Sequence, residues 1–524
     1  ATGQEWDAAA IVIGSGFGGA VAAARLAQAG LSVLVIERGR RWPAGSFPRE
    51  PNLGAGWLWK RGHGLYDLRW LGRMASVQAS GWGGGSLVYA NVFARPPHIL
   101  LDERWPGHLR RDELDPYYDL AAHMLEVHPT TVDPSSGRLP GRTQMVQDLV
   151  GSMDLTGEAM FRPNLAVTFG DPDTVRTNIH GVKRRGCAFG GECVAGCNHG
   201  AKNSLDYTYL AVAEAAGART LTDSQVDRLA PVPGGYQVSV STPSDPSAAP
   251  RRFTAAQVFL AAGAVASTEL LLRARDVHRT LPQLSRRLGE GFSGNGDYLD
   301  LADIRTTTDL TTGPTITTST VLDVPEGKRS VWFQVQDGAI PSSLSRLIEH
   351  LIPARTARRT WRRLRPPDDR QRFALRSMGR DSGKGVLRLN RRGVARLRWQ
   401  NRWQGHLYRA QGRVAPLIAR SLGSSVFAPP TWSVFRRTVT VHPLGGVPTG
   451  PDANTAVADD LGEVHGAPGL YVIDGSVIPA ATGVNPSATI LAAAERSIEH
   501  IIRRSGQPKW RAPEWSPVQH TPAP

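Results

Sequence analysis

The feature that most constrains this chain is a glycine-rich turn that separates an apolar run from an alanine-rich segment near the N-terminus. The run Ala8–Ile13 is followed by the pattern Gly-x-Gly-x-x-Gly over Gly14–Gly19, and then by helical spacing of apolar residues. A second apolar run, Ser32–Ile36, ends at Glu37. A strand, a helix and a strand that ends in an acid are typical of a dinucleotide-binding fold.

Each glycine of this turn has its own physical role. Gly14 permits the tight turn, Gly16 lets the backbone approach a pyrophosphate, and Gly19 lets the helix pack closely on the strand. Backbone amides at the helix start favour bound phosphates. A carboxylate at Glu37 can accept hydrogen bonds from ribose hydroxyls and would repel the 2′-phosphate of NADP. The motif alone leaves NAD and FAD open.

A second glycine cluster, Gly81-Trp-Gly-Gly-Gly85, precedes the sequence Ser-Leu-Val-Tyr-Ala-Asn91. Four glycines in five positions form a loop that can lie against a flat ring. The alternative is an ordinary surface loop, which the apolar residues that follow make less favourable. No histidine lies within Gly81–Gly85, so we expect no covalent flavin link at this loop.

The net charge of +15 at pH 7 is concentrated in one segment. Between Arg346 and Arg398, 17 Lys/Arg and 4 Asp/Glu give a net charge of +13. Without a zinc-finger spacing or an RNA-binding aromatic motif, this local basicity argues against a nucleic-acid partner. It leaves a solvated arginine-rich face, or a docking surface for an electron-acceptor protein or a membrane. Leu344, Leu347, Ile348 and Leu351 form an apolar stripe that could rest on a membrane or cover the protein's own substrate cavity.

The first residues show no signal-type segment, and no apolar run reaches the roughly 20 residues that would span a bilayer. We expect a cytoplasmic protein, with secretion or membrane association left open.

Several blocks along the chain carry a family resemblance. They are His442-Pro-Leu-Gly-Gly446, Leu470–Pro479, Gly483-Val-Asn-Pro486, Asn198–Leu210, Val258–Gly263 and Gly289–Gly296. Together with the first glycine turn, they make the chain similar to the glucose–methanol–choline (GMC) oxidoreductases, and within them to the cholesterol oxidase branch. The resemblance is weakest over residues 301–430, the segment expected to shape the substrate pocket.

The resemblance implies an α/β fold in which a discontinuous Rossmann-like FAD-binding domain is joined to an antiparallel-sheet substrate domain. We assign residues 1–130, 198–300 and 435–505 to the FAD-binding domain, residues 131–197 and 301–434 to the substrate domain and cap, and residues 506–524 to a C-terminal tail. The expected cofactor is non-covalent FAD, and the expected partner is a small-molecule alcohol.

The resemblance also implies the roles of individual residues. His442 would take or orient the hydroxyl proton, and Asn485 would bind the substrate oxygen, although Asn485 could instead serve only as a turn former. An imidazole that titrates near neutrality suits proton removal during hydride transfer. The implied FAD-binding positions are Gly14, Gly16, Phe17, Gly18, Gly19, Glu37, Gly84, Gly85, Ser86, Asn91, Val226, Ala262, Gly263, Asp474, Gly475, Asn485 and Pro486.

One position departs from the steroid-isomerising cholesterol oxidases, which carry a glutamate on a strand before a proline-containing turn. Here the matching stretch is Val331–Pro341, and the glutamate position falls on Gln336, with Asp337 adjacent. An amide cannot carry a proton between ring carbons, so we expect no isomerase activity. Asp337 should point to the opposite face of the strand, but a shift of one residue in the alignment would make it the acid.

The three cysteines of the chain, Cys187, Cys193 and Cys197, lie within eleven residues. Their spacing resembles the cysteine motif of bacterial FAD sugar dehydrogenases of the same superfamily, which implies a three-iron [3Fe-4S] cluster that passes electrons onward. A Cys193–Cys197 disulfide remains an alternative, as does a zinc site with His199 as fourth ligand.

Three functions therefore compete. The first is an FAD alcohol oxidase that acts on a steroid or a similar apolar alcohol. The second is an FAD and iron–sulfur dehydrogenase that acts on a sugar or another secondary alcohol and uses an external acceptor. The third is a non-catalytic flavin-binding electron-relay protein, which the presence of both His442 and Asn485 disfavours.

Overall fold

The computed structural model describes residues 5–50, 52, 54, 56–152, 160–304, 306–351, 369–421, 425–427 and 437–506. Its largest element is a seven-stranded sheet, and both strands of the predicted strand–helix–strand unit belong to it. The strand order is β10-β2-β1-β13-β12-β11, and β22 also pairs with β13. The strands are β1 (Ala8–Ile13), β2 (Val33–Ile36), β10 (Arg219–Leu221), β11 (Gln225–Val232), β12 (Gly235–Ser241), β13 (Arg251–Leu260) and β22 (Leu470–Val472).

The strands β10, β2, β1, β13 and β22 are parallel, whereas β11 and β12 join the sheet in antiparallel pairings. Successive side chains of a strand point to opposite faces of the sheet. Because these buried strands are apolar at successive positions, both faces of the sheet are apolar. Val12 belongs to the core under the helices, and Ile11 belongs to the core on the other face. The parallel strands end at one edge, which is where ligands bind in open α/β sheets.

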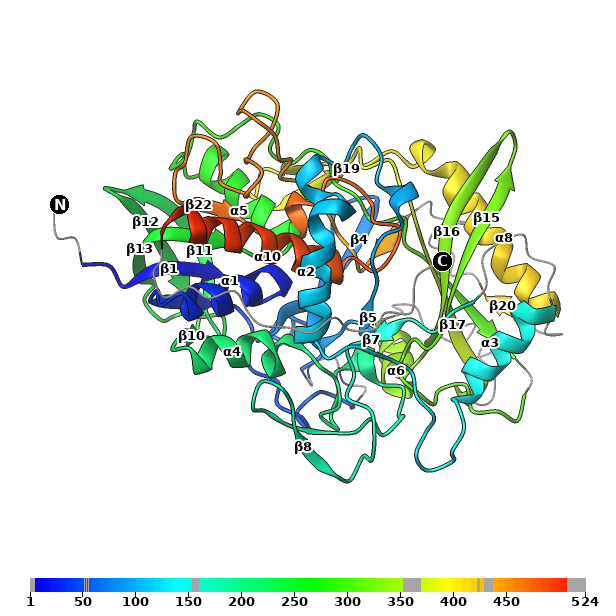
Figure 1. Cartoon of the computed structure of the whole chain (residues 1–524). Coiled ribbons are helices and arrows are strands. Elements are labelled where there is room, and N and C mark those ends of the chain that lie inside the picture. The colour runs from blue at the N-terminus through cyan, green and yellow to red at the C-terminus, as the bar shows by residue number, and fades with distance from the viewer. Residues whose placement is uncertain are drawn as a thin grey trace.

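Helices cover both faces of this sheet. The helix α1 (Phe17–Gln28) is rich in alanine, the strongest helix former, and its small side chains allow close packing on β1. It packs beside α10 (Ser487–Arg504), so two helices that are far apart in the sequence lie side by side on one face (Figure 1). The helices α2 (Arg111–Met124) and α4 (Tyr209–Ala215) complete that face, and α5 (Ala264–Asp276) packs on the other.

A five-stranded antiparallel sheet lies on the far side of the molecule (Figure 1). Its order is β15 (Ser319–Glu326), β16 (Arg329–Ala339), β17 (Arg372–Gly379), β14 (Tyr298–Asp303) and β20 (Ser425–Phe427). One face packs against α8 (Gly405–Ser421) in a separate hydrophobic core, with α3 (Gly141–Ser152) alongside. The expected fold class, a Rossmann-like domain with an antiparallel-sheet domain, is confirmed.

Small sheets and one further helix connect the two large sheets. They are β3 (Tyr66–Trp70), β4 (Met74–Ala79) and β21 (Thr438–Thr440); β5 (Val92–Phe93), β6 (His128–Pro129) and β7 (Asn164–Leu165); β8 (Val175–Thr177) with β9 (Lys183–Arg185); β18 (Val386–Leu389) with β19 (Ala395–Arg398); and α6 (Ser342–Leu351).

The start of the basic segment is partly described. Leu344 and Leu347 on α6 pack into a core with Trp42, Phe47 and Trp57, so this part of the apolar stripe covers the protein itself. The side chains of Ile348 and Leu351, and the arginines within 352–368, lie outside the described residues. No helix of the described part is long and apolar enough to cross a membrane.

Candidate active site

The glycine turn after β1 has the geometry that a bound dinucleotide requires. Gly14 has a φ of +97°, and a side chain at Gly19 would come within 2.0 Å of the Gly14 carbonyl oxygen. At Gly16, by contrast, φ is −70° and a Cβ would meet no protein atom closer than 3.8 Å. The fold therefore crowds Gly14 and Gly19 but keeps the space at Gly16 open, as expected where a pyrophosphate lies.

The second glycine cluster packs directly on this turn. It forms a 3-10 helix, η1 (Gly84–Leu87), and a Cβ on Gly84 would lie 2.7 Å from the Cα of Gly16. The Ser86 hydroxyl donates to the Gly83 carbonyl oxygen at 2.7 Å and accepts the Leu205 N–H at 3.0 Å. Ser86 thus fixes the loop itself, while the backbone of Gly84 approaches the phosphate turn.

Acidic side chains fix the strand ends around the turn. Glu37 accepts hydrogen bonds from the backbone N–H and hydroxyl of Ser15, at 3.1 and 2.7 Å. Asp474 accepts the Gly263 N–H at 2.8 Å and the Ser267 hydroxyl at 2.5 Å. These contacts gather the ends of β1, β2, β13 and β22 at one edge of the sheet.

The remaining predicted cofactor positions lie around the same edge. Phe17 and Gly18 begin α1, Ala262 and Gly263 follow β13, Gly475 follows Asp474, and Pro486 precedes α10. Val226 lies on β11 and packs on the sheet core, close to the end of β2 because the Ser224 N–H donates to the Glu37 carbonyl oxygen.

Asn91 provides a test of whether FAD fits these residues. Its amide is fully buried, yet neither Nδ2 nor Oδ1 has a hydrogen-bond partner among the described residues. The Ser80 hydroxyl and the Trp82 indole N–H of the same region are also buried and unpartnered there. Buried polar groups in native proteins are almost always hydrogen-bonded. The set of unsatisfied donors and acceptors beside the glycine loop fits a bound flavin.

His442 is held by a carboxylate that the sequence motifs did not single out. Its Nδ1 lies 2.8 Å from Asp297 Oδ1. The other carboxylate oxygen accepts the Val441 N–H at 2.9 Å and the Thr440 hydroxyl at 3.0 Å. Since a carboxylate only accepts, Nδ1 carries the proton and Nε2 is left as the basic nitrogen.

Asn485 is held by Gln336. The Gln336 Nε2 donates to Asn485 Oδ1 at 2.8 Å and to Ser319 Oγ at 2.9 Å. Because its oxygen accepts from Gln336, the Asn485 amide keeps its N–H donors for another acceptor.

A single turn supports both residues. Asn295, with a φ of +56°, accepts the Gly483 N–H at 3.0 Å and donates to the Val484 carbonyl oxygen at 2.8 Å. Asp297, two residues later, binds His442. The Gly289–Gly296 block therefore brings the His442 and Asn485 loops together, and an acid directly after this block was the signal available in the sequence.

Asp337 points to the opposite face from Gln336, as predicted. Arg142 Nε donates to Asp337 Oδ2, and the two side chains are almost completely buried. The carboxylate also accepts from Thr317 and Thr318, through both their backbone N–H groups and their hydroxyls. A carboxylate held by this many donors is structural, so the shifted alignment with Asp337 as the acid is wrong.

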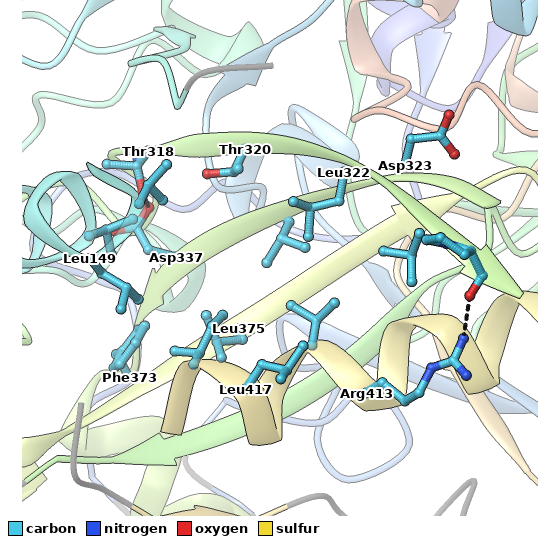
Figure 2. A pocket seen from close by; sticks show the side chains of 17 residues that line it. Leu149, Thr318, Thr320, Leu322, Asp323, Asp337, Phe373, Leu375, Arg413 and Leu417 are labelled. Carbon is cyan, nitrogen blue, oxygen red and sulfur yellow. Dashed lines mark hydrogen bonds between the residues drawn. The ribbon is translucent and has the colours of Figure 1, made fainter. Parts of the chain in front are cut away.

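A cavity of about 290 Å³ lies on that same outer face, between the five-stranded sheet and the helices α3 and α8 (Figure 2). Leu149, Leu322, Phe373, Leu375 and Leu417 line it, and Arg413 donates a hydrogen bond to the Pro325 carbonyl oxygen at one end. Neither His442 nor Asn485 lines this cavity. It belongs to the hydrophobic core of the antiparallel-sheet domain.

The expected iron–sulfur cluster is not supported. Among the described residues, which include all three cysteines, no group of three or more His, Cys, Asp or Glu side chains could hold a metal ion. Cys187 packs in an apolar cluster, and burial raises the pKa of its thiol. A metal ligand must be a thiolate, which such surroundings oppose.

The other expectations for the cysteines also fail. All three thiols are free, so there is no Cys193–Cys197 disulfide. A zinc site with His199 is not supported either, because no group of three ligating side chains is found among the described residues, and the His199 Nε2 contacts the Pro172 carbonyl oxygen at 3.0 Å. The loop is held instead by Lys202, whose Nζ donates to the carbonyl oxygens of Leu87, Tyr89 and Cys193.

Comparison with known proteins identifies the family. Two family models described as GMC oxidoreductase match residues 166–279 and 378–494, and one described as an NAD(P)-binding Rossmann-like domain matches residues 12–62. A cholesterol oxidase of Mycobacterium tuberculosis (strain CDC 1551 / Oshkosh) is 32% identical over 97% of this chain and 93% of its own length. The chain belongs to the GMC oxidoreductases.

Other GMC proteins resemble the chain over nearly its full length. A cholesterol oxidase of Acinetobacter baumannii is 27% identical and is matched over 95% of each chain. The crystal structure of pyridoxine 4-oxidase from Mesorbium loti has a TM-score of 0.63 at 17% identity, over 94% of this chain and 98% of the other. The GMC fold and its glycine turn support FAD as the cofactor.

Proposed function

We propose that this protein oxidises an alcohol to a carbonyl compound, with His442 Nε2 accepting the hydroxyl proton. The observation that carries the proposal is the contact between His442 Nδ1 and Asp297 Oδ1 at 2.8 Å, which fixes the imidazole in the tautomer that can accept a proton. When bound, FAD supplies the hydride acceptor at flavin N5. The resemblance to two cholesterol oxidases, enzymes named for oxidising an alcohol, supports an alcohol as substrate.

Asn485 positions the substrate oxygen in this mechanism. Its N–H donors face away from Gln336 and can bind the oxygen from which His442 removes the proton. A hydrogen bond to that oxygen would align the carbon–hydrogen bond with the hydride acceptor.

Isomerisation of a steroid double bond is not part of the proposed activity. Gln336 occupies the position of the isomerising glutamate, and its amide donates to Ser319 and Asn485. An amide does not act as a general base near neutral pH, and the nearest carboxylate in the strand, Asp337, lies on the other face bound to Arg142.

Molecular oxygen is the proposed electron acceptor. The alternative, a dehydrogenase that relays electrons through an iron–sulfur cluster, loses its support because Cys187, Cys193 and Cys197 are free and form no metal-binding group among the described residues. Peroxide formed per alcohol consumed in aerobic turnover would separate the two acceptors.

The deciding experiment replaces His442 with alanine in the FAD-loaded protein. Loss of a positioned general base should slow anaerobic flavin reduction by alcohol by about 10²–10⁴-fold while the FAD content stays unchanged. Stopped-flow absorbance of the flavin measures the rate, and His465→Ala, whose Nε2 contacts the Gly450 carbonyl oxygen away from the site, is the control. A His442→Ala rate within a few-fold of the unmodified protein would refute the role of His442.

A further inference from the structure

The face of the antiparallel sheet that carries Gln336 also carries an arginine. On β15, β16 and β17, the residues Ser319, Gln336 and Arg376 occupy directly opposed positions, because Ser319 pairs with Gln336 and Gln336 pairs with Arg376. Directly opposed residues in antiparallel strands point to the same face. Since Gln336 hydrogen-bonds Asn485, Arg376 lies on the face directed at the candidate active site.

The guanidinium of Arg376 is enclosed by protein but unpaired. It makes no hydrogen bond, ion pair or ring contact with any residue that the structure describes, and it retains partial solvent exposure. Burial lowers its pKa, while the charges of Asp297 and the phenol of Tyr66 act in the opposite direction. Asp297 is the carboxylate that holds His442, so the free guanidinium lies close to the catalytic pair.

Two other arginines of this domain, Arg142 and Arg372, have acceptors for their guanidinium groups. Arg142 donates to Asp337 and to the carbonyl oxygens of Leu310 and Pro314. Arg372, four residues before Arg376 on the same strand, forms two hydrogen bonds with Asp303, at 2.5 and 2.7 Å. Arg376 is only half-buried, and its N–H donors have no acceptor among the described residues. An unpaired arginine that faces an active site therefore indicates that a ligand supplies the acceptor.

We propose that Arg376 binds a carboxylate on the substrate, so that the alcohol oxidised here is a small hydroxylated organic acid rather than a neutral sterol. The planar guanidinium matches the two oxygens of a carboxylate. A singly charged carboxylate also suits a site next to Asp297 better than a doubly charged phosphate, which the Asp297 carboxylate would repel more strongly. This inference rests on the proposed alcohol oxidation at the same site.

The test measures anion binding directly on the FAD-loaded protein. Acetate and benzoate are titrated against their neutral counterparts acetamide and benzamide at pH 7, and binding is followed by the change in the visible flavin spectrum. We expect the carboxylates to bind more tightly than the amides, and Arg376→Gln to weaken carboxylate binding by about 10- to 100-fold without affecting the amides. Arg388→Gln removes the same charge from an exposed position on β18 and should change nothing.

Two results would overturn the inference. One is equal binding of carboxylates and amides, or a carboxylate preference that survives Arg376→Gln. The other is loss of FAD from Arg376→Gln, which would assign the arginine to the cofactor. Arg376→Lys retains the charge without the planar fork, and we expect it to recover only part of the carboxylate binding.

The same preparation separates this inference from the proposed function. An Arg376-dependent carboxylate preference in a protein whose flavin no alcohol reduces would refute the oxidation but leave the anion site. Flavin reduction by neutral alcohols, with no carboxylate preference, would refute only the anion site.

Discussion

At the scale of single residues, the site depends on side chains that hold other side chains. Asp297 and Gln336 each fix one of the residues proposed to touch the substrate, through hydrogen bonds of 2.8 Å. Their roles follow from which atoms they leave free: the Nε2 of His442 and the N–H donors of Asn485. The chemistry of the site is therefore set as much by these supporting residues as by the family motifs themselves.

Asp297→Asn tests the supporting role at His442. An asparagine amide can donate to Nδ1 and favour the opposite tautomer, in which Nε2 carries the proton, so flavin reduction by alcohol should fall by about 10²–10⁴-fold. As a positioning residue, Asp297 should also affect the pH profile. The pH dependence of flavin reduction by the variant should therefore be shifted from that of the unmodified protein. Asp303→Asn, which breaks a pair with Arg372 elsewhere in the domain, is the control. An unchanged rate and pH profile would show that Asp297 is only structural.

Asp300 gives a pH-dependent contribution to stability. It is buried on β14 facing the outer core, and burial raises its pKa to about 7, from 3.8. Between about pH 4 and pH 7, the Asp300 carboxyl therefore keeps its proton in the folded protein but has lost it in the unfolded chain. This contribution is complete below pH 4 and is lost as the pH rises to about 7, at about 1.4 kcal/mol per pH unit.

Asp300→Asn should remove that loss. We expect the free energy of unfolding of the variant, measured by urea denaturation from pH 4.5 to 8, to exceed that of the unmodified protein increasingly as the pH rises to about 7. Equal pH dependence of both proteins would mean that the Asp300 carboxyl ionises normally in the folded state.

At the scale of elements, the first and last helices are joined by a buried ion pair. Arg25 on α1 donates to both oxygens of Glu495 on α10, at 2.8 and 2.6 Å, and the Tyr209 hydroxyl of α4 donates to the same carboxylate at 2.8 Å. Both charged side chains are almost fully buried. Three helices that are far apart in sequence are thus oriented by one carboxylate on the face of the dinucleotide-binding sheet.

Glu495→Gln should destabilise the protein strongly because it leaves the Arg25 guanidinium buried without a counter-charge. We expect a loss of about 3–5 kcal/mol in the free energy of unfolding, and the double variant Arg25→Met/Glu495→Leu should recover much of it. Glu499→Gln on the same helix removes the charge from a partly exposed carboxylate that pairs with Arg503 and hydrogen-bonds Tyr117, and it should cost under about 1 kcal/mol. Similar losses for both single variants would contradict the role of the buried pair.

At the scale of the whole molecule, the cofactor and substrate sites are built where the two large sheets face each other through their loops. The parallel sheet supplies the glycine turn and Asp474, and the antiparallel sheet supplies Gln336 and Arg376. The turn from Ser293 to Asp297 connects them, since it holds the His442 and Asn485 loops. Asp381 supports this turn by accepting the Ser293 hydroxyl and the Gly294 N–H, each at 2.8 Å.

FAD should stabilise the folded chain without being covalently attached. Acid precipitation should release yellow FAD, and adding FAD to stripped protein at 100 times its dissociation constant should raise the free energy of unfolding by about 2.7 kcal/mol. Gly16→Val is the matched variant, because a Cβ at this position would meet no protein atom closer than 3.8 Å and would enter the space proposed for the pyrophosphate. The free energy of unfolding of this variant should equal that of the stripped protein and should not change when FAD is added. A pellet that stays yellow, or a Gly16→Val protein that FAD stabilises, would contradict this picture.

The sequence by itself determined the elements whose physics is local. Gly14, Gly16 and Gly19 specify the phosphate turn because their lack of a side chain is a property of the chain alone. The strand period placed Gln336 and Asp337 on opposite faces. The family motifs marked His442 and Asn485, while the division into domains and the catalytic roles stay predictions.

Only the tertiary structure decided which groups satisfy one another. Asp297 contacts His442, 145 residues away in the sequence, and Gln336 contacts Asn485, 149 residues away. No local sequence pattern could therefore predict either pair. The cysteine spacing suggested a metal site, but the three thiols are free and form no metal-binding group among the described residues. Arg372 and Arg376 lie on the same strand, yet only Arg372 has a carboxylate partner among the described residues. Pairing, burial and their absence depend on long-range packing, which spacing along one chain does not encode.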